Sequence, residues 1–116
     1  MKAKISAVAQ KTKLADDCDT TCPVQRTAKI LDGKWTTLIV RDLMGGKKRY
    51  SELQRSLSGI SPRLLAARLR LLKRNGMLTR TVFPTVPPTT EYELTVLGNG
   101  LRGVIKAMAK FGTSLE

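Results

Sequence analysis

The sequence of 116 residues contains no histidine, and this absence limits the chemistry that the protein can perform. Histidine is the side chain that titrates nearest neutral pH, and it is the commonest metal ligand. A hydrolase of the usual kinds is hard to build without it, so we predict that the protein is not an enzyme and uses no cofactor. A zinc site would need both cysteines from two copies of the chain to reach four ligands, and we predict no bound metal.

Aromatic residues and long apolar runs are also scarce. The aromatic residues are Trp35, Tyr50, Phe83, Tyr92 and Phe111. The core must therefore consist mostly of leucine, isoleucine and valine. No apolar stretch approaches the ~20 residues that span a bilayer, and the first residues lack the apolar centre of a secretory signal. Because the chain has only Cys18 and Cys22 as thiols, we expect a cytoplasmic protein in a reducing compartment.

Acidic residues are few, since 9 Asp and Glu stand against 21 Lys and Arg and give a formal charge of +12. Within residues 47–80 there are ten basic residues and a single acid, Glu52. A diffuse excess would indicate an ordinary solvated basic surface, whereas a concentrated run favours a polyanionic partner. We therefore predict that the protein binds nucleic acid and does not bind a membrane.

The first half of the sequence predicts an N-terminal extension followed by three helices. Residues 1–20 are polar and alternate in charge, which predicts a mobile or loosely helical segment, whereas residues 21–116 have the length of one domain. Residues 23–31 predict a short helix with Cys22 at its N-cap and Pro23 just inside. Apolar residues between 35 and 43 predict a second helix, which ends before Gly45. A third follows from Ser51, which we expect at its N-cap.

The second half predicts a long helix, a β-hairpin and a last helix. Residues 61–76 have Ser61 as a cap, Pro62 just inside the helix and Gly76 at its end. Residues 78–83 and 91–94 alternate like two antiparallel strands, and Thr95 caps a helix that runs on to Phe111. This order predicts a mainly α protein with a two-stranded β-wing, in the α+β class. It is the order of a winged helix-turn-helix.

The helix over residues 61–76 has two different faces at about 100° per residue. Leu65, Leu69 and Leu72 form one stripe that must face the core. The opposite face is basic, which fits either an ordinary solvated surface or a recognition helix in the major groove. The turn before it and the wing after it favour recognition. The predicted base-contacting residues are Ser61, Arg63, Ala66, Ala67 and Arg70.

Other basic residues flank this helix and are better placed for the phosphate backbone. Phosphate contacts fix the register of a protein on DNA without reading its sequence. The predicted phosphate-contacting residues are Lys47, Lys48, Arg49, Lys73, Arg74 and Arg80. Arg80 is the basic residue of the wing, which we expect to act mainly in packing.

Cys22 stands where a helix usually begins with serine or aspartate. A helix N-terminus carries a partial positive charge that stabilises a thiolate. A solvent-accessible thiolate can be oxidised and can then form a disulfide with a second thiol, for which Cys18 is the candidate. Cys22 could equally be a small residue that caps the helix and has no reactivity.

Several motifs occur in a fixed order along most of the chain: Cys-Pro-Val at 22–24, Gly-Lys-Trp at 33–35, Gly-Ile-Ser at 59–61, Pro-Pro at 87–88, and Leu-Thr at 94–95 with Gly98. In these motifs the sequence resembles the HxlR family of MarR-like bacterial transcription regulators. The resemblance implies a homodimer, built from the terminal helices, that binds a palindromic DNA operator. It also implies an oxidant or electrophile as inducer, sensed at Cys22. Cys18 lies outside the shared pattern, and its pairing within or between chains stays open.

The last helix is the predicted site of dimerisation. Leu101, Ile105 and Met108 form a stripe longer than one small core needs, and the glycines at 98, 100 and 103 would let a partner helix approach closely. We therefore expect a transcriptional repressor that binds DNA as a dimer. A constitutive, weakly specific nucleic-acid-binding module with inert cysteines is the alternative. A thiol-dependent enzyme, such as a small peroxidase, is disfavoured by the missing histidine.

Overall fold

The computed structural model describes residues 22–115. The chain divides into two compact units, Met1–Asp32 and Gly33–Glu116. The extension expected over residues 1–20, including Cys18, lies outside the described residues. In the first unit, helix α2 (Pro23–Ile30) begins with Cys22 at its N-cap and Pro23 at its first position, as expected from the sequence.

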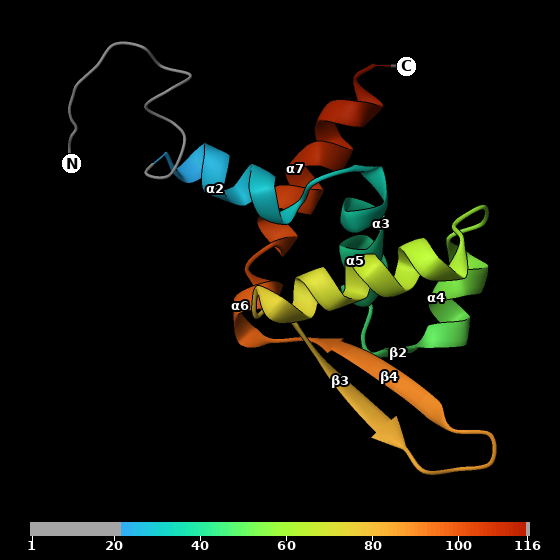
Figure 1. Cartoon of the computed structure of the whole chain (residues 1–116). Helices are drawn as coiled ribbons and strands as arrows, with labels where there is room; N and C mark the ends of the chain where they lie inside the picture. The colour runs from blue at the N-terminus through green and yellow to red at the C-terminus, as the bar shows by residue number, and fades with distance from the viewer. Residues whose placement is uncertain (1–21, 116) are drawn as a thin grey trace. The chain divides into compact units, whose positions relative to one another are not determined.

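The second unit contains five helices and three strands within its described residues (Figure 1). In chain order they are α3 (Lys34–Leu43), β2 (Lys48–Arg49), α4 (Tyr50–Ser56), α5 (Pro62–Arg74), β3 (Leu78–Phe83), β4 (Thr89–Leu94), α6 (Val96–Asn99) and α7 (Arg102–Thr113). The predicted fold class is therefore confirmed: the protein is mainly helical with a small antiparallel wing.

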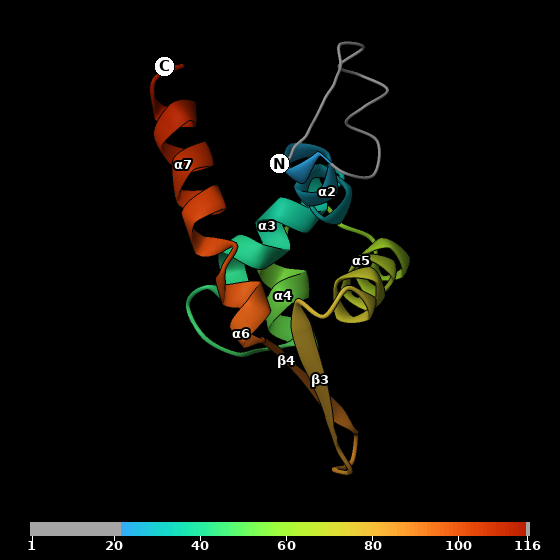
Figure 2. The same ribbon diagram turned by 90° about the vertical axis from the view of Figure 1, so that its left-hand side faces the viewer.

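Helix α3 is the centre of this unit. It contacts α4, α5, α7 and β4, and Figure 2 shows the other helices arranged around it. Thr36, Ile39 and Val40 have no exposed surface, and Leu43 is 2% exposed. These residues recur every three or four positions, so one face of the helix is buried against its neighbours.

Helix α4 begins two residues earlier than expected, with Arg49 and not Ser51 at its N-cap. The backbone N–H of Arg49 donates to Glu52 Oε1 at 2.7 Å. Arg49 is extended (φ −80°, ψ 157°) because it also ends strand β2. The expected Ser51 cap is therefore wrong, since strand pairing places the first turn of the helix before Ser51.

The wing is a three-stranded sheet in the order β2-β4-β3. The predicted hairpin is confirmed, with β3 and β4 paired antiparallel from Leu78↔Leu94 to Phe83↔Thr89. Strand β2 was not expected; it pairs with β4 through Lys48↔Tyr92 and Arg49↔Glu91. The hairpin projects from the end of α5, away from α7 (Figures 1 and 2).

The single helix expected after Thr95 is two helices, α6 and α7. Thr95 does cap α6, since its Oγ1 accepts from Gly98 N at 2.9 Å. Beyond it, Gly100 N donates to Leu97 O and Leu101 N to Gly98 O, both at 3.0 Å. These bonds span three residues, so the chain tightens by a 3₁₀-like turn between α6 and α7.

Gly98 is packed closely against its own chain. A Cβ at this position would overlap the carbonyl oxygen of Met77. Two hydrogen bonds hold the same place together: Thr95 N donates to Met77 O at 3.0 Å, and Thr95 Oγ1 donates to Gly76 O at 2.6 Å. The residues between α5 and β3 are thus fixed to the start of α6, and this contact needs glycine at 98.

The close approach at Gly98 predicts opposite effects of alanine at two glycines. Gly98→Ala forces the backbone of Met77 to move, and should lower the free energy of unfolding by about 1–3 kcal/mol, as overpacking does. Gly103→Ala adds a methyl group that meets no described atom within 4 Å beyond the adjacent residues and backbone of its own helix. Inside a helix, it should raise stability by roughly 0.5–1 kcal/mol. Urea unfolding measures both values, and equal effects would contradict the contact at Met77.

Candidate nucleic-acid interface

Helix α5 is held in one rotation by its start and by its buried stripe. Ser61 Oγ accepts from Leu64 N at 3.1 Å, and Pro62 occupies the first turn. Leu65 and Leu72 are 0% exposed and Leu69 is 1% exposed, as the spacing predicts. Burial of each leucine contributes roughly 1.5–3 kcal/mol relative to exposure. The opposite face of α5 must therefore point to solvent.

The solvent face of α5 carries uncompensated positive charge. Arg63, Arg70, Lys73 and Arg74 are exposed. Within residues 22–115, none of these four side chains has a carboxylate within ion-pair distance. Their charges are therefore available to an external anion.

The remaining residues predicted to contact bases are smaller. Ala66 and Ala67 are partly buried on the flanks of α5, and Ser61 is exposed. The Ser61 hydroxyl already accepts one hydrogen bond, from the backbone N–H of Leu64. The structure brings this set together on one surface of α5, and its contact with bases stays a prediction.

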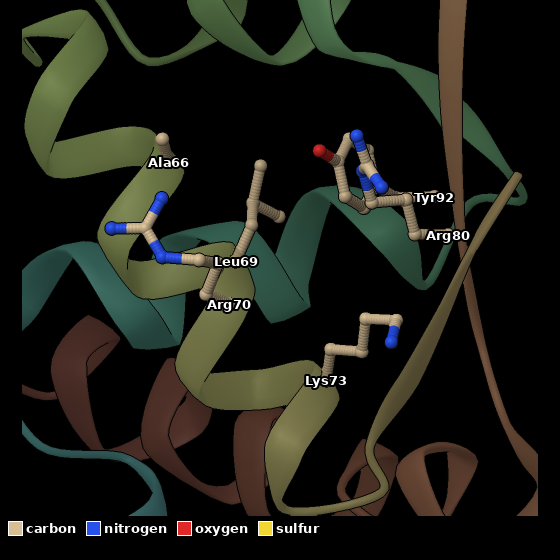
Figure 3. Close-up of a pocket in the computed structure, with 6 residues that line it drawn as sticks. All are labelled: Ala66, Leu69, Arg70, Lys73, Arg80 and Tyr92. Atoms are coloured by element: carbon tan, nitrogen blue, oxygen red, sulfur yellow. The ribbon is translucent and has the colours of Figure 1, made fainter. Parts of the chain in front are cut away.

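The wing contributes a second basic group next to α5. Arg80 on β3 faces Tyr92 on β4, and Tyr92 in turn faces Lys48 on β2, so the three residues form one row across the sheet. Cross-strand partners lie on the same side of a sheet. Arg80 and Tyr92 line a pocket of about 380 Å³ together with residues of α5 (Figure 3).

The three basic residues before α4 divide between the two sides of the sheet. Glu91 Oε1 lies 4.0 Å from Lys47 Nζ, and Glu91 Oε2 lies 3.8 Å from Arg49 Nε. Lys48 is on the side of Tyr92, away from Glu91. Lys47 and Arg49 thus share the carboxylate of Glu91. Its negative charge offsets part of the positive charge of these two residues, which were predicted to contact DNA phosphates.

Tyr50 connects the two helices of the helix-turn-helix. Its hydroxyl donates to Pro62 O at 2.9 Å, which joins the start of α4 to the start of α5. Burial, and secondarily the neighbouring Tyr92, raises the pKa of Tyr50 above its ordinary value. The sequence pattern places Tyr92 in the second strand of the hairpin, but it gives neither tyrosine a role at the helix-turn-helix. Both tyrosines have polar neighbours in the sequence, so no apolar pattern indicates that they lie close to each other beside α4 and α5.

The residues assigned to dimerisation occupy different places on α7 and just before it. Leu101 is 7% and Ile105 8% exposed, so both belong to the core of the single chain. Met108 is 48% and Phe111 67% exposed, and Leu115 beyond the helix is 72% exposed. The exposed apolar surface at this end of the chain therefore consists of Met108, Phe111 and Leu115.

Cys22 is partly exposed at the N-cap of α2, with extended backbone (φ −73°, ψ 122°). Within the described chain its side chain makes no capping hydrogen bond to the helix. Lys29 lies in the last turn of the same helix.

None of the helices over residues 22–115 has both the length and the apolar character that a membrane crossing requires.

Comparison with known proteins agrees with this geometry. The model of the HxlR-like helix-turn-helix family matches residues 30–116. The chain belongs to this family. It is similar to an HTH-type transcriptional regulator of Synechocystis, with 40% identity over 102 residues that cover 85% of this chain and 76% of the relative. The protein is therefore a helix-turn-helix transcriptional regulator that binds DNA.

Solved structures show the same fold in related chains. A MarR-family regulator from Porphyromonas gingivalis is 40% identical with a TM-score of 0.78, covering 82% of this chain and 93% of that chain. The redox regulator HypR in its oxidised form is 36% identical with a TM-score of 0.74, covering 80% of this chain and 96% of that chain.

The raised pKa of Tyr50 predicts a loss of stability in alkaline solution. The folded state holds the Tyr50 proton more tightly than the unfolded chain does. Its contribution is therefore complete below the unfolded pKa of about 10 and is lost as the pH rises through the folded pKa. Urea unfolding from about pH 9 to 11 should show a shallower decline for Tyr50→Phe than for the wild type. Parallel declines would mean that another group causes the dependence.

Proposed function

We propose that the protein is a repressor, and not an enzyme, that binds a palindromic operator as a homodimer and responds to oxidation or alkylation of Cys22. The observation that carries the operator proposal is the exposed face of α5. Within residues 22–115 its arginines have no carboxylate partner, while the leucines on the other side hold the helix in place. Arginine can bind guanine through two hydrogen bonds, which gives discrimination of roughly 1–3 kcal/mol for each contact.

Dimerisation would place two such helices on one operator. Half-sites of a palindrome lie about one DNA turn apart, roughly 34 Å, and a dimer must match that spacing. The exposed side chains of Met108 and Phe111 on α7, with Leu115, supply an apolar surface of the kind that a second copy covers. We assign the dimer contact to this surface, in place of Leu101 and Ile105.

Regulation through Cys22 rests on its position and on the likeness to a redox regulator. Cys22 is at a helix N-terminus and is partly exposed, so reagents in solution can reach it. Helix N-termini favour the thiolate, which is the reactive form of cysteine. The redox regulator HypR, which has the same fold at 36% identity, was solved in an oxidised form.

Base and phosphate contacts predict different behaviour of four arginine and lysine variants. Arg63→Ala and Arg70→Ala should each weaken operator binding by about 1–3 kcal/mol and affect binding to random DNA much less. Lys48→Ala and Arg74→Ala should weaken both to a similar degree and reduce the salt slope by about one. Gel shifts against the region upstream of the gene, with a shuffled duplex as control, measure these ratios.

A wild-type protein that binds the upstream region and the shuffled duplex equally would contradict a specific operator. It would favour the weakly specific nucleic-acid-binding module, because a specific site is typically bound ~10³-fold or more tightly than random DNA. Equal behaviour of all four variants would contradict the division between bases and phosphates.

The proposed sensor predicts that Cys22→Ser binds the operator but does not respond to oxidants. Serine caps a helix well, so folding and DNA affinity should be preserved. Diamide and a quinone should change the operator affinity of the wild type and leave that of Cys22→Ser unchanged. Cys18→Ser is the matched control, and it should lose only a response that requires a disulfide between the two thiols. Identical responses of wild type and Cys22→Ser would remove Cys22 from regulation.

A further inference from the structure

A pocket of about 380 Å³ lies between the recognition helix and the wing. It is lined by Ala66, Leu69, Arg70, Lys73, Arg80 and Tyr92, all drawn in Figure 3. Three of the six are cationic and none is acidic. Sites for small molecules or parts of them have volumes of roughly 300–1,000 Å³, so the pocket has room for one oxyanion with the group that carries it.

The pairing of the strands keeps negative charge away from this pocket. Arg80 is the cross-strand partner of Tyr92, and both face α5. Glu91 and Glu93 alternate with Tyr92 along β4, so their side chains leave the opposite side of the sheet. The acids of the wing are thus segregated from its pocket-lining arginine, and within residues 22–115 Arg80 and Lys73 have no carboxylate partner.

The side chains converge from two elements. In Figure 3, Lys73 extends from α5 toward β3, while the side chains of Arg80 and Tyr92 reach the pocket from the wing. The guanidinium of Arg70 points the other way, along the outer face of the helix. Tyr92 is 7% exposed, and none of the hydrogen bonds among the described residues uses its hydroxyl. A cation from each element and one hydroxyl donor therefore face the same space.

We propose that this pocket is a subsite for a single phosphate group, held jointly by Lys73 and Arg80, with a hydrogen bond from the Tyr92 hydroxyl. The proposal rests on the proposed function where the phosphate belongs to a DNA backbone. A free phosphate ion has the same chemistry and is the other source. Arginine supplies a planar fork of N–H donors and lysine a point charge, a combination suited to the several oxygens of one phosphate.

A shared phosphate has a consequence that two separate contacts lack. The slope of log affinity against log salt counts the phosphates that a protein neutralises, at about 0.9 for each in duplex DNA. If Lys73 and Arg80 hold the same phosphate, the double variant loses that single phosphate, whereas each single variant keeps one cation beside it. Separate phosphates would instead give additive losses.

The salt slope is measured by fluorescence anisotropy on a duplex of random sequence, for the full chain and its variants. The double variant of Lys73→Gln and Arg80→Gln should reduce the slope by about one, and each single variant should reduce it by less than that. Tyr92→Phe removes a hydrogen bond without changing charge, so it should weaken binding about tenfold and keep the wild-type slope. Lys106→Gln combined with Lys110→Gln removes two charges from α7 and should leave the slope unchanged. A double variant whose salt slope falls by about two, or does not fall at all, would overturn the shared site.

A second arm distinguishes the two sources of phosphate. At constant ionic strength, chloride is replaced by inorganic phosphate while the protein is bound to the random duplex. A free ion that enters the pocket displaces DNA from the wild type more than chloride does, and this excess disappears in the double variant. Equal displacement by the two anions assigns the pocket to backbone phosphate alone. An excess that persists in the double variant would place the ion elsewhere and overturn the assignment.

Failure of this subsite can be told apart from failure of the proposed operator. Phosphate contacts do not read sequence, so the slope measurement does not depend on whether an operator exists. A protein without sequence preference can still show the single shared phosphate. A specific repressor can equally show additive slopes, which would overturn the subsite alone.

Discussion

The rotation of α5 about its own axis determines most of what the protein can contact. Three buried leucines at 65, 69 and 72 fix that rotation. Exposing any one of them to water would cost roughly 1.5–3 kcal/mol of folding free energy. Turning the helix by one residue, about 100°, would expose this stripe and bring arginines toward the core. An arginine without a partner is costly to bury. The same few residues therefore stabilise the fold and aim Arg63 and Arg70 outward.

The second constraint is the position of the wing relative to α5. Gly98 against the backbone of Met77, together with the hydrogen bonds of Thr95, fixes the point where β3 leaves the helix. From that point the strand register places Arg80 opposite Tyr92. A backbone contact that involves no basic residue thus influences which cations meet, and the pocket beside α5 depends on it.

Local patterns in the sequence were sufficient for α5 and its buried face, but not for the start of α4. Ser61 and Pro62 define the start of α5, and the leucine spacing defines its orientation. Strand β2 could not be predicted, because two residues carry no alternation and their pairing depends on a strand more than forty positions away. The same limit applies to Arg80 with Tyr92, whose meeting requires the register, and to Leu101, whose burial follows from the tight turn after α6.

NMR of the arginine side chains during a titration with DNA tests most directly whether α5 and the wing form the binding surface. The Nε–H resonances of Arg63, Arg70 and Arg80 should shift together and saturate with the duplex. Arg102, whose Nε donates to Asn99 at 3.0 Å at the start of α7, should remain unchanged and serves as the internal control. The largest shift at Arg102, with Arg63 and Arg70 unaffected, would contradict DNA recognition by this face of α5.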